Sequence, residues 1–255
     1  MPNHITNELT ADKHVINSLK RGELELDFET VAPIPEVFKG KPSGMVVDWA
    51  NITMGIVNLK TLLELKPDPV AAVKSWDYKS ATLTLKQSTD LHALHEGPFP
   101  INWSNEDFEQ LIGCMRGLKE HGHASWYEWC IENWGTKWNA YKILRVSETV
   151  VKFQTAWSAP LPLLDKLCKK FPDSQIKLRW ADEDFGNNTG CVLATAKWGG
   201  VEFTGGLLEN GSPKAHALAM ELIHEGIVPS YMKLEVDGRY SYLDDNGGLD
   251  DKDDE

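Results

Sequence analysis

The sequence has few cysteines, and none of them is spaced as in a common metal or redox motif. Four occur in 255 residues, and no two are separated by exactly two residues. Zinc sites and redox-active disulfides usually place two cysteines in that spacing. Free cysteines on apolar helix faces behave as small hydrophobic side chains. We therefore expect four reduced thiols in a cytoplasmic protein, at Cys114, Cys130, Cys168 and Cys191.

Long apolar runs and basic runs are also missing. No window reaches about 18 consecutive apolar residues, so we expect no membrane span. The opening MPNHITNELTADKHV lacks the basic and apolar regions of a secretory signal, so we expect none. Acids outnumber bases by 38 to 26, which gives a formal charge of −12. Non-specific nucleic-acid binding requires Lys and Arg at phosphates, so this composition disfavours that function.

The common catalytic and nucleotide-binding motifs are absent as well. There is no GxSxG, no GxxxxGK[ST] and no convincing GxGxxG. His121 and His123 supply two potential metal ligands, but a zinc site needs three or four, so a polar helix end is the preferred interpretation. The acids at 182–184 could bind a cation, but a solvated turn is preferred. We expect no metal and no cofactor, and we lean against an enzyme.

Tryptophan is abundant, and four of the ten lie in the stretch SWYEWCIENWGTKWNAY at 125–141. Ser125 and Glu128 have the spacing of a capping box, which predicts a helix start. Gly135 predicts its end, as a residue with positive φ after the last turn. The preferred interpretation is a helix fixed in a core by its indoles. The alternative is an aromatic platform for a ligand.

Periodicity divides the chain into four parts. Residues 1–40 read as strand–helix–strand, with the second strand at 24–31. Residues 41–124 are mostly helical, including a capped helix from Ser104 to Gly122. Residues 125–243 follow the Trp-rich helix with strands and helices, and residues 244–255 carry seven acids and one Lys. A segment so acidic and so poor in apolar residues is expected to be disordered.

The order of elements after the Trp-rich helix is β-α-β-β-α-β with one extra strand. The strands are expected at 143–157, 176–180, 191–197, 201–207 and 231–243, and the helices at 158–171 and 212–226. For 231–243 a hairpin through Asp237 and Gly238 is the alternative to a single strand. This order fits a ferredoxin-like antiparallel sheet with two helices on one face.

Four segments resemble a known family. They are NWGTKWNAY at 133–141, FQTAWSAPLPLLDKLCKKFP at 153–172, the opening MPNHITNEL, and DFETVAPIPE at 27–36. Together they resemble YubB-like or Api-like proteins of bacteriophages, prophages and conjugative plasmids. The resemblance implies an α+β chain with a ferredoxin-like domain at its C-terminal end. It implies no activity and no catalytic residues.

These features lead to one functional hypothesis and two alternatives. The hypothesis is a non-enzymatic accessory protein of a mobile genetic element, in the cytoplasm of the bacterial host. Its acidic surface would bind a host or element-encoded macromolecule, most simply a basic protein. The first alternative is binding of single-stranded nucleic acid on the exposed face of the sheet. The second is an enzyme of unknown reaction. The candidate binding residues are Lys137, Trp138, Lys152, Trp157, Lys177, Arg179 and Trp180.

Overall fold

The chain forms two compact units, one inserted into the other. The computed structural model describes residues 3–65, 68–77, 82–96 and 103–243. Met1–Pro33 and Ile131–Glu255 form the first unit, here called the sheet unit, and Ile34–Cys130 form the second, the helical unit. The sequence had suggested divisions at residues 40 and 124, so the observed divisions lie a few residues away. The predicted acidic tail, 244–255, lies outside the described residues.

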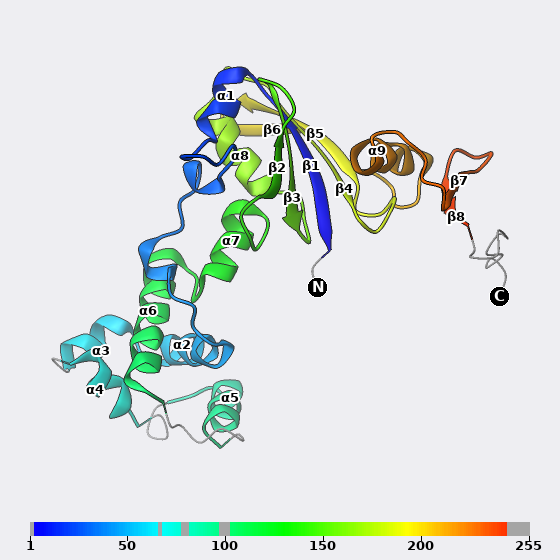
Figure 1. Ribbon diagram of the computed structural model, residues 1–255. Coiled ribbons are helices and arrows are strands. Elements are labelled where there is room, and N and C mark those ends of the chain that lie inside the picture. The colour runs from blue at the N-terminus through cyan, green and yellow to red at the C-terminus, as the bar shows by residue number, and fades with distance from the viewer. Residues whose placement is uncertain (1–2, 66–67, 78–81, 97–102, 244–255) are drawn as a thin grey trace. The chain divides into compact units, whose positions relative to one another are not determined.

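The sheet unit contains a six-stranded antiparallel sheet in the order β2-β3-β1-β4-β5-β6 (Figure 1). The most N-terminal strand, β1, pairs with β3 on one side and with β4 on the other. Its alternating pattern puts Ile5, Asn7 and Leu9 on a buried face. The strands are β1 (His4–Thr10), β2 (Tyr141–Arg145), β3 (Val150–Ala156), β4 (Ile176–Asp182), β5 (Gly190–Lys197) and β6 (Gly200–Leu207).

The topology is a ferredoxin-like arrangement whose central strand comes from the N-terminus. Both β3 and β4 are antiparallel to β1, so they are parallel to each other and are joined through α8 (Leu161–Lys170). This is a split β-α-β unit with β1 in the gap. Following β1 comes α1 (Lys13–Ser18), and the chain later returns as β2 beside β3. The sequence prediction had kept residues 1–40 apart from the sheet. The structure places their first strand in its middle.

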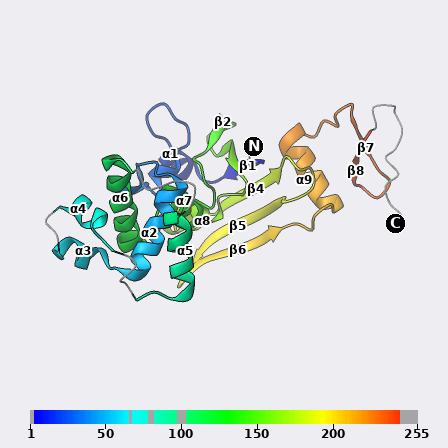
Figure 2. The same cartoon turned by 90° about the horizontal axis from the view of Figure 1, so that it is seen from below.

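The helices cover both faces of the sheet. Leu9 and Leu178 face Leu163 and Leu167 of α8 across the main core, so α8 lies on that face, and Leu19 after α1 lies there too. The last helix, α9 (Pro213–His224), meets β4 on the other face, where its Glu221 accepts from Arg179. The helices predicted at 158–171 and 212–226 were expected on one face, but the structure places α8 and α9 on opposite faces, and α1 is the helix that shares the face of α8 (Figures 1 and 2).

Three predicted strands take other forms. The strand expected at 24–31 is wrong: the chain makes an isolated bridge between Arg21 and Leu24 and then a 3-10 turn, η1 (Phe28–Thr30). The reason is that Asp27 accepts a hydrogen bond from the Glu29 amide at 2.9 Å and turns the chain. The strand expected at 143–157 is the hairpin β2–β3. The strand expected at 231–243 is a separate hairpin of β7 (Met232–Leu234) and β8 (Tyr240–Tyr242).

The helical unit is built around α6 (Asn105–His121). Ser104 and Asp107 form a capping box at its start, and Gly122 ends it with φ of 79°, so this predicted helix is confirmed. Its core joins residues such as Trp49, Leu111 and Met115. No helix in the described part of the chain is long and apolar enough to span a membrane. The other elements are η2 (Glu36–Phe38), α2 (Gly44–Ile56), α3 (Leu59–Leu65), α4 (Pro69–Lys74), α5 (Leu85–Glu96) and α7 (Trp126–Trp134), which continues into the sheet unit.

Candidate functional site

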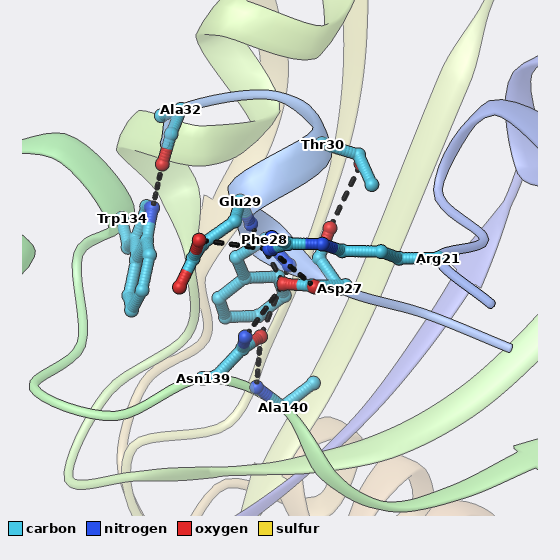
Figure 3. Close-up of polar contacts among 9 residues, drawn as sticks. All are labelled: Arg21, Asp27, Phe28, Glu29, Thr30, Ala32, Trp134, Asn139 and Ala140. Carbon is cyan, nitrogen blue, oxygen red and sulfur yellow. Dashed lines mark hydrogen bonds and ion pairs between the residues drawn. The ribbon is translucent and has the colours of Figure 1, made fainter. Parts of the chain in front are cut away.

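Within the sheet unit, the NWGTKWNAY motif at 133–141 is hydrogen-bonded to the segment 27–32 (Figure 3). Trp134 is 2% exposed, and its indole Nε1 donates to the Ala32 carbonyl at 2.9 Å. Asn139 donates to the Asp27 carboxylate at 2.7 Å and accepts from the Phe28 amide at 3.0 Å. The core interpretation of Trp134 is therefore confirmed, and the motif also holds the DFE segment that resembled the same family.

Asp27 is the centre of that network. Its side chain is buried, and it accepts from the Asn139 amide, the Glu29 backbone and Arg21, the last at 3.2 Å. Hydrogen bonds to Glu29 and Asp27 raise the pKa of Arg21 above its usual value. These contacts explain the 3-10 turn and occupy the buried carboxylate of Asp27 with protein donors.

The residues after Trp134 run alongside the loop that follows β3. Gly135 has φ of +84°, and a Cβ there would lie 2.5 Å from Cδ of Pro162. Thr136 is fully buried; its hydroxyl donates to the Ala156 carbonyl at 2.9 Å and accepts from the Ala156 amide at 3.3 Å. Ser158 donates to the Gly135 carbonyl. Two segments about twenty residues apart are thereby held together, which brings Lys137 and Trp138 next to Trp157.

Lys137, Trp138 and Trp157 form an exposed group, here called the indole–lysine cluster. The Lys137 ammonium lies 4.2 Å from the centroid of the Trp138 ring and 5.7 Å from that of Trp157. The two indoles are 41% and 51% exposed. A cation over an exposed indole stabilises the arrangement by about 0.5–1 kcal/mol per contact. The cluster therefore presents fixed aromatic surface around one positive charge.

The backbone of Trp157 is held in an unfavourable conformation. Its φ is +72°, which is rare for a bulky residue and costs roughly 1–3 kcal/mol. Its amide donates to the Asn3 carbonyl at 3.0 Å, and its carbonyl accepts from the Asn188 side chain at 3.3 Å. Strain of this kind persists only where neighbours enforce it, and it concentrates at functional sites.

Asp182 connects the two asparagines that hold Trp157. It is 4% exposed and accepts from Asn3 at 3.1 Å, from Asn188 at 2.9 Å and from the Asp184 amide at 3.0 Å. Of the acids predicted to form a solvated turn, only Glu183 and Asp184 are exposed. Asp182 is instead a buried acceptor that positions the exposed indole.

The other candidate residues lie elsewhere on the sheet. Lys152, Lys177 and Arg179 share the face opposite the main core. Arg179 is hydrogen-bonded to Glu8 at 3.0 Å and to Glu221 at 2.9 Å, and Lys152 lies 3.9 Å from Glu8. Arg179 and Lys152 on this face are thus next to carboxylates, and Lys177 is exposed.

Trp180, predicted as a candidate binding residue, does not lie on an accessible surface. It is 3% exposed and points into the main core with Ile176 and Leu178, because residues two apart on a strand share a face. Phe153 is buried on the same side. Among the described residues, no group of three His, Cys, Asp or Glu side chains could hold a metal ion. His216 on α9 is 8% exposed and accepts a hydrogen bond from the Tyr240 amide.

Comparison with known proteins identifies one domain. Residues 133–210 match the family model described as the ferredoxin-like domain in Api92-like protein. This confirms the Api-like resemblance and the ferredoxin-like domain. The matched range holds β2 to β6 and α8 and excludes the central strand β1.

Whole-protein comparisons add little. No curated protein matches the chain. Among solved structures, the chain is similar to the crystal structure of the protein Api92 from Yersinia pseudotuberculosis, with 12% identity and a TM-score of 0.32. The similarity covers 80% of this chain and 99% of that one.

Proposed function

We propose that this chain, which carries the ferredoxin-like domain of Api92-like proteins, is a non-enzymatic accessory protein of a mobile genetic element. It acts in the cytoplasm of the bacterial host by binding a protein partner through the indole–lysine cluster. The observation that carries the proposal is the fixed, exposed pair of indoles around Lys137. Tryptophan is enriched among the few residues that dominate binding energy at protein interfaces.

The charge around the cluster supports a partner with a basic patch. Glu183 and Asp184 are exposed and follow directly on Asp182, which positions Trp157. Acids and bases balance within residues 131–243, so the acidic excess of the chain lies outside the ferredoxin-like domain, half of it in 244–255. The tail would then strengthen attraction to a basic partner over a distance, while the cluster provides the contact.

Binding of single-stranded nucleic acid on the sheet face is less well supported. Stacking platforms combine exposed aromatics with a positively charged groove. Here Phe153 and Trp180 are buried on the face that α8 covers. On the opposite face, where α9 meets β4, Arg179 is hydrogen-bonded to Glu8 and Glu221, and Lys152 lies near Glu8. The exposed indoles of the cluster are the surface on which bases could still stack.

Affinity capture with matched variants tests the proposal. The bait is the full chain, in wild-type form and with the double change Trp138→Ala and Trp157→Ala. Trp198→Ala is the control, because Trp198 is an indole that is more exposed than those of the cluster but lies in the β5–β6 turn at the other end of the sheet. A bait ending at Leu243 tests the tail. Bound proteins are identified by mass spectrometry and bound nucleic acids by sequencing.

The expected result is a bacterial protein retained by wild type and by Trp198→Ala and lost with the double variant. At low salt, the bait ending at Leu243 should bind this protein more weakly than wild type, because it lacks the acidic residues that attract a basic partner. At high salt the two baits should bind alike, because salt screens that attraction. Binding that survives the double variant would refute the cluster as the contact. Nucleic acid captured in a cluster-dependent manner would favour the alternative.

A further inference from the structure

The two edges of the sheet differ in how well they are protected. The β2 edge is five residues long, and its pairing with β3 shifts register between Tyr141 and Leu144. Lys142 there has φ of +49°. Short length, an irregularity and exposed charge are the features by which proteins prevent an edge strand from pairing with another chain.

The β6 edge is longer, and its pairing with β5 keeps one register throughout, although Glu202 is exposed and Gly205 has φ of +95°. All eight residues pair in unbroken register, from Gly190↔Leu207 to Lys197↔Gly200. The sequence GVEFTGGL contains no proline, and its one charged residue, Glu202, lies 3.5 Å from Lys197. Among the described residues no strand lies on its outer side. Its outward backbone amides and carbonyls are therefore available for a further strand.

The side chains of β6 extend the apolar face of the sheet beyond its covering helix. Phe203 pairs with Ala194, which is fully buried on the face that α8 covers, so Phe203 points to that same side. It is 39% exposed, and Leu207, at the end of the same strand, is 62% exposed. A strand added here would bury apolar surface as well as satisfy the backbone.

We propose that β6 pairs antiparallel with β6 of a second copy of this chain, about a two-fold axis at Phe203. Such an axis stands perpendicular to the sheet and keeps the apolar faces of both copies on one side. Each Phe203 then lies opposite its counterpart, an aromatic cross-strand pair that is favourable. Glu202 lies opposite Thr204, and Val201 opposite Gly205. Moving the axis to Glu202 would place two carboxylates face to face, which is unfavourable.

The same register accounts for the exposed residues at the ends of β6. Trp198, in the turn before the strand, is the most exposed indole of the sheet unit. With the axis at Phe203, this turn lies alongside Leu207 and Leu208 of the second copy. Each copy would thereby supply apolar neighbours to the other at both ends of the paired strands. The two sheets become one continuous sheet through the dimer.

Sedimentation of the full chain over a range of concentrations measures the association. The expected result is a monomer–dimer equilibrium that Phe203→Lys weakens by about tenfold or more, since two ammonium groups then face each other and the aromatic pair is lost. Leu144→Lys on β2 is the control, because Leu144 is 58% exposed on the opposite edge. It should leave the dissociation constant unchanged.

Disulfide trapping tests the register. Opposite residues in an antiparallel pair have Cα atoms about 4.5–5.5 Å apart, within the range that a disulfide spans. In a Cys191→Ser background, Phe203→Cys should form covalent dimers on mild oxidation, whereas Leu207→Cys should not. A monomer at all concentrations, or a dimer that Phe203→Lys leaves intact, would overturn the proposal. So would trapping through Leu207→Cys alone.

Discussion

A buried carboxylate controls an exposed indole in this protein. Asp182 accepts three hydrogen bonds, two of them from the side chains of Asn3 and Asn188. The Asn3 carbonyl and the Asn188 side chain in turn bond the strained backbone of Trp157. All three partners are hydrogen-bond donors. A side chain at position 182 that carries an N–H group in place of a carboxylate oxygen therefore cannot accept from all three. The exposed face of Trp157 thus depends on a group that solvent hardly reaches.

Replacing Asp182 with Asn tests this dependence. One of the three donors should lose its acceptor, so the free energy of unfolding should fall by about 1–3 kcal/mol. Binding of the captured partner should weaken as Trp157 relaxes. Urea unfolding and partner affinity are the measurements, with Asp173→Asn, in the exposed turn before β4, as the control. Equal effects of the two substitutions would contradict the positioning role.

His216 makes the stability of the sheet unit depend on pH. Burial lowers the pKa of His216 below 6.5, nearby Arg239 lowers it further, and Asp237 partly offsets these effects. The Nδ1 atom accepts from the Tyr240 amide at 2.8 Å, which requires the imidazole to be unprotonated at that atom. Below pH about 6.5 the unfolded chain binds a proton that the folded chain does not.

The stability that His216 contributes should therefore be complete above pH about 6.5 and decline as the pH falls through its lowered folded-state pKa. Urea unfolding of wild type and His216→Gln at several pH values measures this. The difference between them should be largest near neutral pH and shrink in acid. If the difference in unfolding free energy grows as the pH falls, the pKa of His216 is raised in the folded state and not lowered.

Individual site residues were only partly predictable. Lys137, Trp138 and Trp157 could be selected as aromatic and basic residues, but neither their exposure nor their contact could be predicted. The hydrogen bonds that bring their two segments together form only in the fold. Asn3 and Asn188 act through hydrogen bonds formed only in the fold. The error at Trp180 was avoidable, since Ile176, Leu178 and Trp180 already alternate as one apolar face.

At the scale of elements, caps and glycines predicted helix ends well. Ser104, Gly122 and Gly135 were placed correctly, because capping chemistry is local. The strand expected at 24–31 failed because the apolar alternation of Leu24, Leu26 and Phe28 also fits a turn held by Asp27, whose partner Asn139 is over a hundred residues away. Local patterns could not reveal that contact.

Gly135 offers a test at this scale. Gly135→Ala should destabilise the sheet unit by roughly 1–3 kcal/mol, since the residue needs φ of +84° and a Cβ would meet Pro162. Gly226→Ala is the matched control: Gly226 also follows a helix, with φ of +77°, but nothing lies within 4 Å of its added Cβ. Thermal unfolding should show a larger loss for Gly135→Ala, and a reversed order would contradict the packing argument.

The whole molecule is a sheet unit interrupted by a helical unit. The sequence suggested a helical middle region and a ferredoxin-like domain, and both are present. It did not suggest that the N-terminal strand belongs to that domain, because strand pairing between distant segments leaves no local pattern. Within the sheet unit, the hydrogen bond from Trp134 to the Ala32 carbonyl shows that the two ends of the interruption lie close together.

Replacing residues 34–130 with a short Gly/Ser linker should therefore leave the sheet unit folded. The contacts of β1 with β3 and β4, and those of Asn139 with Asp27, all lie outside the removed segment. Circular dichroism and thermal unfolding should show a cooperative transition. An unfolded product would mean that the sheet unit requires the helical unit.

The central position of β1 also sets an order of events during synthesis. This strand leaves the ribosome well before its two partners, which end at Ala156 and Asp182. At about 5–20 residues per second, roughly ten to thirty-five seconds pass before both partners exist. The inserted helices can form their own core in that interval. Strand β1 must therefore wait, unpaired, until β4 is complete, and during this interval the nascent chain is most exposed to aggregation and chaperone binding.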